Sequence, residues 1–224
     1  MTKAVFRKKW LVFAAICLAF VFGGYTWFKV SGHDYTSIEE LASNPANIQA
    51  IDSGIHLLLQ GDVVVRTGND ITSTMFCKMN RTDKTYSHCG IVMIENGYPY
   101  IYHSIGGQDN PDEILRRDSA SFWFSPMHNS GFGIIRFSFS SSQLDSLKQI
   151  TLRYYHARKK FDMDFDLKDD SKLYCAELVY KSLNYAMKDS NFIKTTTWMG
   201  KEYVATDNFT LSEHAHLICQ VKYK

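Results

Sequence analysis

The chain lacks two features that would fix its class at once: it has no Cys-x-x-Cys pair, and no long basic run follows its first 30 residues. Because 224 residues can bury a substantial core, we expect no disulfide framework. Because a nucleic-acid partner needs a concentrated basic face, we exclude nucleic acid. Internal repeats are also absent from the sequence, which favours a single globular domain.

Charge is absent from Trp10 to Phe28, a stretch nearly as long as the roughly 20 residues that cross a bilayer as a helix. Basic residues cluster just before it, at Lys3, Arg7, Lys8 and Lys9. Such clusters keep an N-terminus in the cytoplasm. The sequence therefore predicts a transmembrane anchor or a signal peptide at residues 1–30, with the retained anchor favoured. Residues 31–224 are then the functional domain, membrane-anchored or secreted, on the extracytoplasmic side.

Cysteines are few after the N-terminal segment, at Cys77, Cys89, Cys175 and Cys219. Their number is even and an exported domain can meet an oxidising environment, but no close spacing pairs them. We interpret them as mostly buried thiols. Cys175 is the exception, because it falls at the expected start of a helix.

Hydrophobic periodicity and turn signals predict a mixture of helices and strands. Helices are expected at residues 37–60, 71–79, 111–121, 143–160 and 173–187. Strands are expected at residues 61–66, 88–104 as a hairpin, 132–139, 161–167 and 215–223. The acidic stretch at 161–167 also imitates a calcium loop. That interpretation fails, because Leu167 and Leu173 stand where such a loop needs glycine and glutamate.

The dipeptide Asn96-Gly97 is the one best suited to a two-residue type I′ hairpin turn. If these residues form the loop, His103 lies opposite Gly90. His88 and His103 then share a face as diagonal neighbours, with Cα atoms about 7 to 8 Å apart, and glycine leaves room beside them. The register therefore predicts a hydrogen-bonded histidine pair.

Cys175 falls in the first turn of the helix predicted at 173–187. The positive end of the helix dipole lowers a thiol pKa there, from about 8.5 into the roughly 3.5 to 7.5 range of reactive cysteines. Backbone N–H groups at the same helix start can bind an oxyanion. A thiol hydrolase needs such a thiolate, an imidazole and a group that orients the imidazole. We predict Cys175 as nucleophile, His88 as general base and acid, and His103 as the orienting residue.

Each of these residues also has a purely structural interpretation. A cysteine on the apolar face of a helix is most often a small buried hydrophobe, and a strand histidine is usually structural or exposed. Zinc is a further alternative, because one cysteine and two histidines would leave an open fourth position, but the usual close ligand spacing is missing. We therefore expect no metal and no cofactor.

Three blocks of sequence resemble the YiiX/YebB-like family, a permuted NlpC-like branch of the papain-like cysteine hydrolases. The blocks are GDVVVR at Gly61–Arg66, YSHCGIV at Tyr86–Val92 and YCAELV at Tyr174–Val179, with the histidine before the cysteine. The resemblance implies an α+β, permuted papain-like fold, in which the cysteine helix packs against an antiparallel sheet that carries the histidine. The chain departs from the family at His103, where we expect glutamate. The related lecithin retinol acyltransferase-like proteins have histidine there.

The resemblance implies an exported thiol hydrolase of the peptidase or amidase type, which cleaves an amide bond, for example in cell-wall peptides. His103 and the N-terminal segment favour an alternative, a lipid acyltransferase or thioesterase-like enzyme. A third alternative is a non-catalytic binding module that keeps a relic site. The expected partners are a peptide, amide or lipid substrate, and a membrane through the N-terminal helix. Because a carboxylate stabilises an imidazolium directly, we expect His103→Glu to keep activity and His103→Ala to lose much of it.

Overall fold

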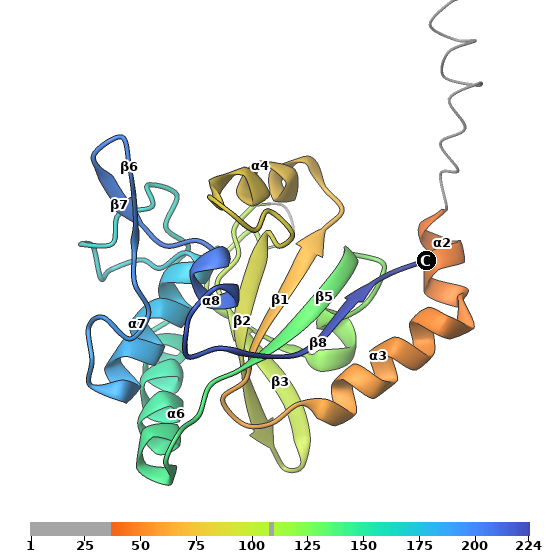
Figure 1. Cartoon of the computed structure of the whole chain (residues 1–224), viewed down its shortest axis with the longest axis horizontal. Helices are drawn as coiled ribbons and strands as arrows, with labels where there is room; N and C mark the ends of the chain where they lie inside the picture. Colours follow the sequence, from red (N-terminus) through yellow and green to blue (C-terminus); the bar gives the residue numbers. More distant parts are fainter. Residues whose placement is uncertain (1–36, 108–109) are drawn as a thin grey trace, which may run out of the picture. The chain divides into compact units, whose positions relative to one another are not determined.

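A six-stranded antiparallel sheet organises the described part of the chain, residues 37–107 and 110–224 of the computed structural model (Figure 1). In order across the sheet, its strands are β4 (Arg116–Ser119), β3 (Tyr98–His103), β2 (His88–Glu95), β1 (Val63–Gly68), β5 (Asn129–Arg136) and β8 (His216–Lys222). A second sheet pairs β6 (Thr196–Trp198) with β7 (Lys201–Tyr203). The helices are α2 (Ile38–Ser43), α3 (Pro45–Leu57), α4 (Ile71–Met79), α5 (Ala120–Trp123), α6 (Ser141–His156), α7 (Cys175–Met187) and α8 (Asp207–Thr210).

The anchor or signal peptide predicted at residues 1–30 lies outside the described residues. From residue 38 onward the chain forms one compact unit of the α+β class, which falls within the domain predicted at residues 31–224. No helix in the described ranges is both long and apolar enough to cross a membrane.

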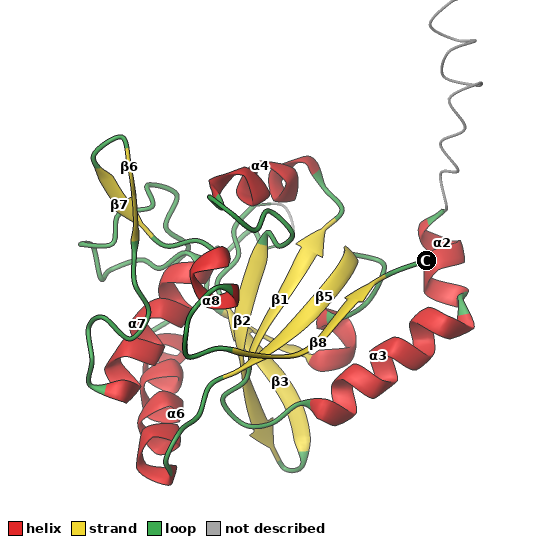
Figure 2. Ribbon diagram, viewed as in Figure 1, coloured by secondary structure: helices red, strands yellow, loops and turns green. Residues whose placement is uncertain are grey.

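Helices cover both faces of the six-stranded sheet (Figure 2). α6 and α7 pack on one face, against buried side chains that include Ile91, Met93 and Tyr102. α3 and α5 cover the other face, against Val92 and Ile101. The two sets alternate along β2 and β3, as strands between two apolar layers require. Close packing on both sides makes the sheet a rigid support for the residues at its ends.

The β2–β3 hairpin has the register that the sequence predicts. Asn96 and Gly97 adopt φ angles of 50° and 84°, because a type I′ turn needs positive φ at both central residues. Glu95 pairs with Tyr98, and the pairing continues along both strands without a shift. The turn of the hairpin therefore determines which side chains of β2 and β3 meet at the far end of these strands.

The prediction of a helix at residues 111–121 is wrong. Arg116–Ser119 instead forms β4, the edge strand that pairs with β3, and the single turn α5 follows it. The Ser119 hydroxyl begins this turn by accepting the N–H of Phe122 at 3.3 Å. Every side chain of β4 is polar, so no apolar alternation marks it as a strand. The error matters because β4 carries one residue of the candidate site.

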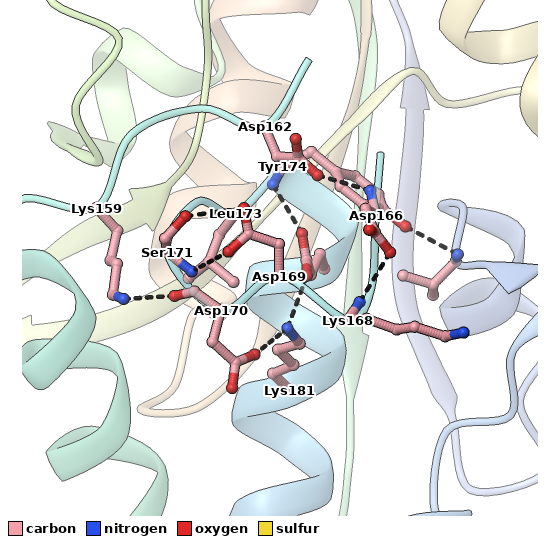
Figure 3. A network of polar contacts seen from close by, with 12 residues as sticks. Lys159, Asp162, Asp166, Lys168, Asp169, Asp170, Ser171, Leu173, Tyr174 and Lys181 are labelled. Carbon is pink, nitrogen blue, oxygen red and sulfur yellow. Dashed lines mark hydrogen bonds and ion pairs between the residues drawn. The ribbon is translucent and has the colours of Figure 1, made fainter. Parts of the chain in front are cut away.

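The prediction of a half-exposed strand at residues 161–167 is also wrong, because this segment is a loop. Asp162 is buried, and its carboxylate accepts the N–H of Asp164 at 2.9 Å and that of Asp166 at 2.7 Å (Figure 3). An aspartate that bonds backbone groups a few residues ahead stabilises a turn rather than an extended strand.

A polar network holds the residues that follow this loop, 168–173, against α7 (Figure 3). Asp170 forms an ion pair with Lys181 on α7. Lys181 also lies 2.8 Å from the carboxylate of Glu177, one turn earlier on the helix. On the other side, the Ser104 hydroxyl donates a hydrogen bond to the carbonyl of Leu173. These contacts fix the position at which α7 begins.

Glu177 is completely buried in the first turn of α7, where its carboxylate accepts the N–H of Tyr174 at 3.3 Å. Burial raises its pKa from 4.5 to about 7, although Lys181 acts in the opposite direction. The folded protein therefore holds this proton more tightly than the unfolded chain does. The stability that this group contributes is complete below pH 4.5 and is lost as the pH rises through about 7.

Glu177→Gln should remove this pH dependence, because glutamine keeps an acceptor for the N–H of Tyr174 but carries no charge. The unfolding free energy of the parent protein should fall as the pH rises from roughly 5 to 8. We expect the fall in the variant to be smaller by about 1 to 3 kcal/mol. Urea unfolding at several pH values measures the difference. The exposed Glu202→Gln serves as the matched control, and parallel pH profiles for Glu177→Gln and the parent protein would contradict the expectation.

Candidate active site

Cys175 is the first residue of α7, at the position where the sequence predicts a helix start. Its side chain is nearly buried, with the residue 7% exposed. The first N–H groups of a helix have no partner within it and form the positive end of its dipole. The sulfur therefore lies beside a set of hydrogen-bond donors that suits a negative charge.

The two predicted histidines lie at the ends of neighbouring strands, His88 opening β2 and His103 closing β3. A Cβ atom added to Gly90 would lie 2.5 Å from Cγ2 of Ile101 and 3.1 Å from Cβ of His103, so the space beside this ring favours glycine. Nε2 of His88 and Nδ1 of His103 are 3.0 Å apart, which is a hydrogen bond. The structure thus contains the histidine pair that the register predicts.

Asp118, which no pattern in the sequence indicates as a site residue, extends this pair. Nε2 of His103 lies 2.9 Å from Oδ2 of Asp118, and Arg116 donates to the other carboxylate oxygen at 2.9 Å. Both residues belong to β4, the strand that was predicted as a helix. A β3–β4 pairing would have placed Asp118 beside His103, but no apolar pattern in the sequence indicates that pairing.

Trp123 packs against both histidine rings. Its ring stacks on His88 with centroids 5.1 Å apart and meets His103 edge-on at 4.7 Å. The Arg66 guanidinium lies over the Trp123 ring, 4.3 Å from its centroid. This packing fixes the orientation of both imidazoles and excludes water from them.

Burial controls the charge of both histidines. It lowers the pKa of His88 to about 4, although a hydrogen bond and the negative charge of Cys175 act in the opposite direction. Burial likewise lowers the pKa of His103 to about 4, against the effect of its bond to Asp118. An isolated imidazolium is therefore unfavourable in this site, and His88 is charged only when the sulfur beside it is ionised.

The pKa of Cys175 is lowered well below its ordinary value of 9.0. The largest cause is a hydrogen bond from the thiol of Cys89, and the charge and hydrogen bond of His88 act in the same direction against burial. Cys89 is completely buried on β2, next to His88 in the chain. From the sequence, Cys89 is expected only as a buried thiol, whereas in the structure it lowers the pKa of the candidate nucleophile.

Cys89→Ala should raise the pH midpoint for alkylation of Cys175 by about one unit, because the thiolate loses a hydrogen-bond donor. The thiolate is the reactive form, so the alkylation rate is high above this pKa and falls below it. Mass spectrometry after timed iodoacetamide treatment at different pH values measures the midpoint. Cys89→Ser keeps a donor and should stay close to the parent, and Cys219→Ala is the matched control. An unshifted midpoint in Cys89→Ala would refute the assigned contact.

The sulfur of Cys175 faces a small cavity of about 20 Å³. Three segments that lie far apart in the sequence close over it: α4, the loop at 161–167 and the segment after β7. Their side chains at the cavity are mostly apolar and include Phe76, Met79, Phe165 and Val204. Phe76 and Phe165 meet across it with ring centroids 5.8 Å apart. We call these three segments the roof of the site.

The donors around Cys175 do not converge as metal ligands do. Both ring nitrogens of His103 are engaged, one with His88 and the other with Asp118. Across the residues that the structure describes, no group of three or more His, Cys, Asp or Glu side chains is placed to hold a metal ion. The zinc alternative therefore has no fitting ligand set in this part of the chain.

The fold and site together define a mixed α+β protein with a buried cysteine and two histidines around the end of an antiparallel sheet. No family model matches the chain. Over 129 residues it is 26% identical to the "Uncharacterized protein YiiX" of Escherichia coli (strain K12), a match that covers 57% of this chain and 58% of that protein. The crystal structure of metalloprotein yiiX from Escherichia coli O157:H7 superimposes with a TM-score of 0.60 at 17% identity, and covers 73% of this chain and 97% of that one. These matches confirm the resemblance to a YiiX-like family.

Proposed function

We propose that this chain is a thiol hydrolase of the permuted papain-like type, in which Cys175 is the nucleophile, His88 the general base and acid, and His103 the residue that orients His88. One observation carries the proposal. A thiol at a helix start has its pKa lowered by a neighbouring imidazole, and that imidazole forms a hydrogen bond of 3.0 Å with a second one. An inert core thiol would need neither ring, and burying two imidazoles costs free energy unless their hydrogen bonds are satisfied.

The reaction begins when the proton of Cys175 passes to His88, so that sulfur carries a negative charge and the ring a positive one. The sulfur then attacks the carbonyl carbon of the substrate, and the carbonyl π electrons move to its oxygen. Backbone N–H groups at the start of α7 stabilise this oxyanion. The intermediate collapses as His88 returns its proton to the leaving amine, and a thioester remains on Cys175.

Water completes the cycle by attacking the thioester. His88, now neutral, removes one proton from the water, and the new intermediate expels the sulfur. A carboxylic acid is released, and the thiolate–imidazolium pair is restored. His103 changes no bond in this scheme but keeps one nitrogen of His88 directed towards the sulfur.

The substrate class that we propose first is an amide, as in cell-wall peptides. The test is incubation of the purified full-length chain with peptidoglycan fragments, followed by mass spectrometry of the products. Cys175→Ala is the matched control because it removes one sulfur atom and leaves the fold. Release of new amine and carboxyl termini by the parent protein alone supports the proposal, and identical product profiles for both proteins refute it.

The roof favours a second candidate, an enzyme that removes or transfers the acyl group of a lipid. Phe76, Met79 and Phe165 present apolar surface at the sulfur, which suits an acyl chain better than a charged peptide. Incubation with a lipid extract, with and without a primary amine as acceptor, separates the two candidates. Consumption of lipid esters without cleavage of peptidoglycan fragments would establish the second.

A non-catalytic binding module would share this fold but would not need an activated sulfur. It predicts that Cys175 resists alkylation at neutral pH. Rapid alkylation of Cys175 in the folded protein excludes this alternative.

The similar protein of Escherichia coli O157:H7 is called a metalloprotein. In this chain the side chains around Cys175 do not fit a metal, because each nitrogen of His103 already bonds to a protein group. We therefore route no step of the reaction through a metal ion.

We also propose that residues 1–30 hold or export the domain on the extracytoplasmic side of a membrane. Protease treatment of intact cells and of spheroplasts tests this placement. Digestion of the domain in spheroplasts, with cytoplasmic proteins protected, supports export. Protection of the domain until the membrane is lysed refutes it.

A further inference from the structure

The chain of hydrogen bonds that starts at His88, beside Cys175, does not end at the orienting histidine. It continues from His103 to the Asp118 carboxylate at 2.9 Å, and from there to Arg116 at 2.9 Å. The side chain of Asp118 is only 10% exposed. The strand register explains the contact, because β4 places Arg116 opposite His103 and Asp118 two residues further along on the same face.

The chemistry of Asp118 fixes the direction of every hydrogen bond in this chain. Burial acts to raise the pKa of Asp118, but the bond from His103 and the charge of Arg116 bring it below its ordinary value. The carboxylate is therefore ionised and can only accept hydrogen bonds. Nε2 of His103 must then carry a hydrogen, which leaves Nδ1 of His103 as an acceptor.

The same logic applies to the next ring. Nδ1 of His103 accepts, so Nε2 of His88 must donate the bond of 3.0 Å between them. A neutral imidazole carries one hydrogen, which leaves Nδ1 of His88 with a free electron pair. That is the nitrogen available to take the proton of Cys175.

We propose that Asp118 is the positioning residue of this site, which acts through His103 to hold His88 in the tautomer whose Nδ1 is basic. The proposal rests on the proposed thiol chemistry for its catalytic consequence, but the tautomers themselves are independent of any substrate. Asp118 also supplies the negative charge that His103 lacks, and so stabilises the imidazolium formed on His88. As in other carboxylate–imidazole pairs, the carboxylate itself takes no proton.

The other charged or titratable groups around the pair come from several elements. Arg66 of β1, Arg116 of β4 and His128 before β5 line a cavity of about 80 Å³ together with His103 and Asp118. Of these groups, Asp118 alone can be an anion. A substitution that removes the charge of Asp118 therefore removes the negative charge of that cavity and leaves Arg66 and Arg116 beside the histidines.

Asp118→Asn is the sharpest test, because it preserves shape and can reverse the chain. The new amide donates to Nε2 of His103, whose Nδ1 then carries the hydrogen and donates to His88. Nδ1 of His88 becomes protonated in the neutral ring and can no longer act as a base. We expect turnover and the alkylation rate at neutral pH to fall at least about 100-fold, with partial recovery at alkaline pH, where Cys175 ionises without help.

Nitrogen-15 NMR of histidine-labelled full-length protein reads the tautomers directly, with signals assigned by their loss in His88→Gln and His103→Gln. The parent protein should show His103 with hydrogen on Nε2 alone and His88 with hydrogen on Nε2, joined by one on Nδ1 where the ring has taken the proton of Cys175. Asp118→Asn should show His103 with hydrogen on Nδ1 alone. Asp118→Glu keeps an ionised acceptor and should retain the parent tautomers, and the exposed Asp145→Asn is the control for loss of charge.

Hydrogen on Nδ1 of His103 in the parent protein would overturn the proposal, even if Asp118→Asn fails to fold. So would unchanged tautomers and alkylation in a folded Asp118→Asn variant. Reversed tautomers in a protein that turns over no substrate would support the proposal and refute the proposed function instead. The two failures are therefore distinguishable.

Discussion

His88→Ala should abolish turnover and shift the alkylation midpoint of Cys175 upward. In the proposed reaction the ring accepts the thiol proton, and general acid–base groups contribute about 100-fold to 10,000-fold to rates. Its loss also removes the positive charge that favours the thiolate, so the rate of alkylation at neutral pH should fall at least about tenfold. Timed alkylation from acid to alkaline pH, followed by mass spectrometry of the Cys175 peptide, measures both effects.

The sign of the pH effect is the useful part of this experiment. In the parent protein the lowered pKa should keep Cys175 reactive at a pH well below the ordinary thiol pKa of 9.0, and reactivity should be lost only below that lowered pKa. In His88→Ala the loss should occur at a higher pH. The exposed His56→Ala is the matched control, since its ring lies on α3 and should leave the profile unchanged. An acidic midpoint that survives in His88→Ala would show that the helix start and Cys89 activate the sulfur alone.

The second large effect concerns His103→Glu, whose outcome depends on Asp118. The introduced carboxylate would stand where a ring now bonds Asp118 at 2.9 Å, and two carboxylates at such a distance cannot both be ionised. We therefore expect His103→Glu to keep only part of the activity. Adding Asp118→Asn to this variant should raise activity, because the amide donates to the introduced carboxylate instead of competing with it.

Asp118→Asn is thus expected to lower activity at least about 100-fold when His103 is present. When glutamate replaces His103, Asp118→Asn is expected to increase activity. Rates for the four proteins of this double-mutant cycle, measured with whichever substrate class is established, give the coupling directly. His103→Ala should lose much of the activity with either residue at 118. A loss of similar size from Asp118→Asn in both backgrounds would mean that Asp118 acts on the fold and not through the ring at 103.

The sequence predicts the parts of this site that depend on local pattern. The start of α7 follows from the apolar spacing of the helix, and the histidine pair follows from one turn dipeptide, Asn96-Gly97, because side chains alternate strictly along a strand. Both signals act over a few residues. The positions of Cys175, His88 and His103 were therefore accessible from sequence, although their catalytic roles stay predictions.

The parts that depend on long-range pairing were not accessible. Asp118 contributes only because the polar segment Arg116–Ser119 pairs with β3, and nothing in its composition distinguishes an edge strand from a loop. The roof is a similar case, since Phe76 and Phe165 meet only after three distant segments pack together. Cys89 was visible in the sequence, but its contact with Cys175 depends on how α7 crosses β2.

The tight fit of the roof over Cys175 bears on the fate of an acylated intermediate. A cavity of about 20 Å³ has room for roughly one water molecule, so the resting protein cannot hold an acyl group and an acceptor together. In the proposed reaction, the choice between hydrolysis and transfer after the first product departs depends on what lies in the cavity beside the thioester. In the proposed reaction, Phe76 and Phe165 in their present positions leave room for water at the thioester, and water would consume it. If a bulky amine or alcohol holds them apart, the acyl group leaves on that acceptor, and one protein can show either outcome according to what fills the space first.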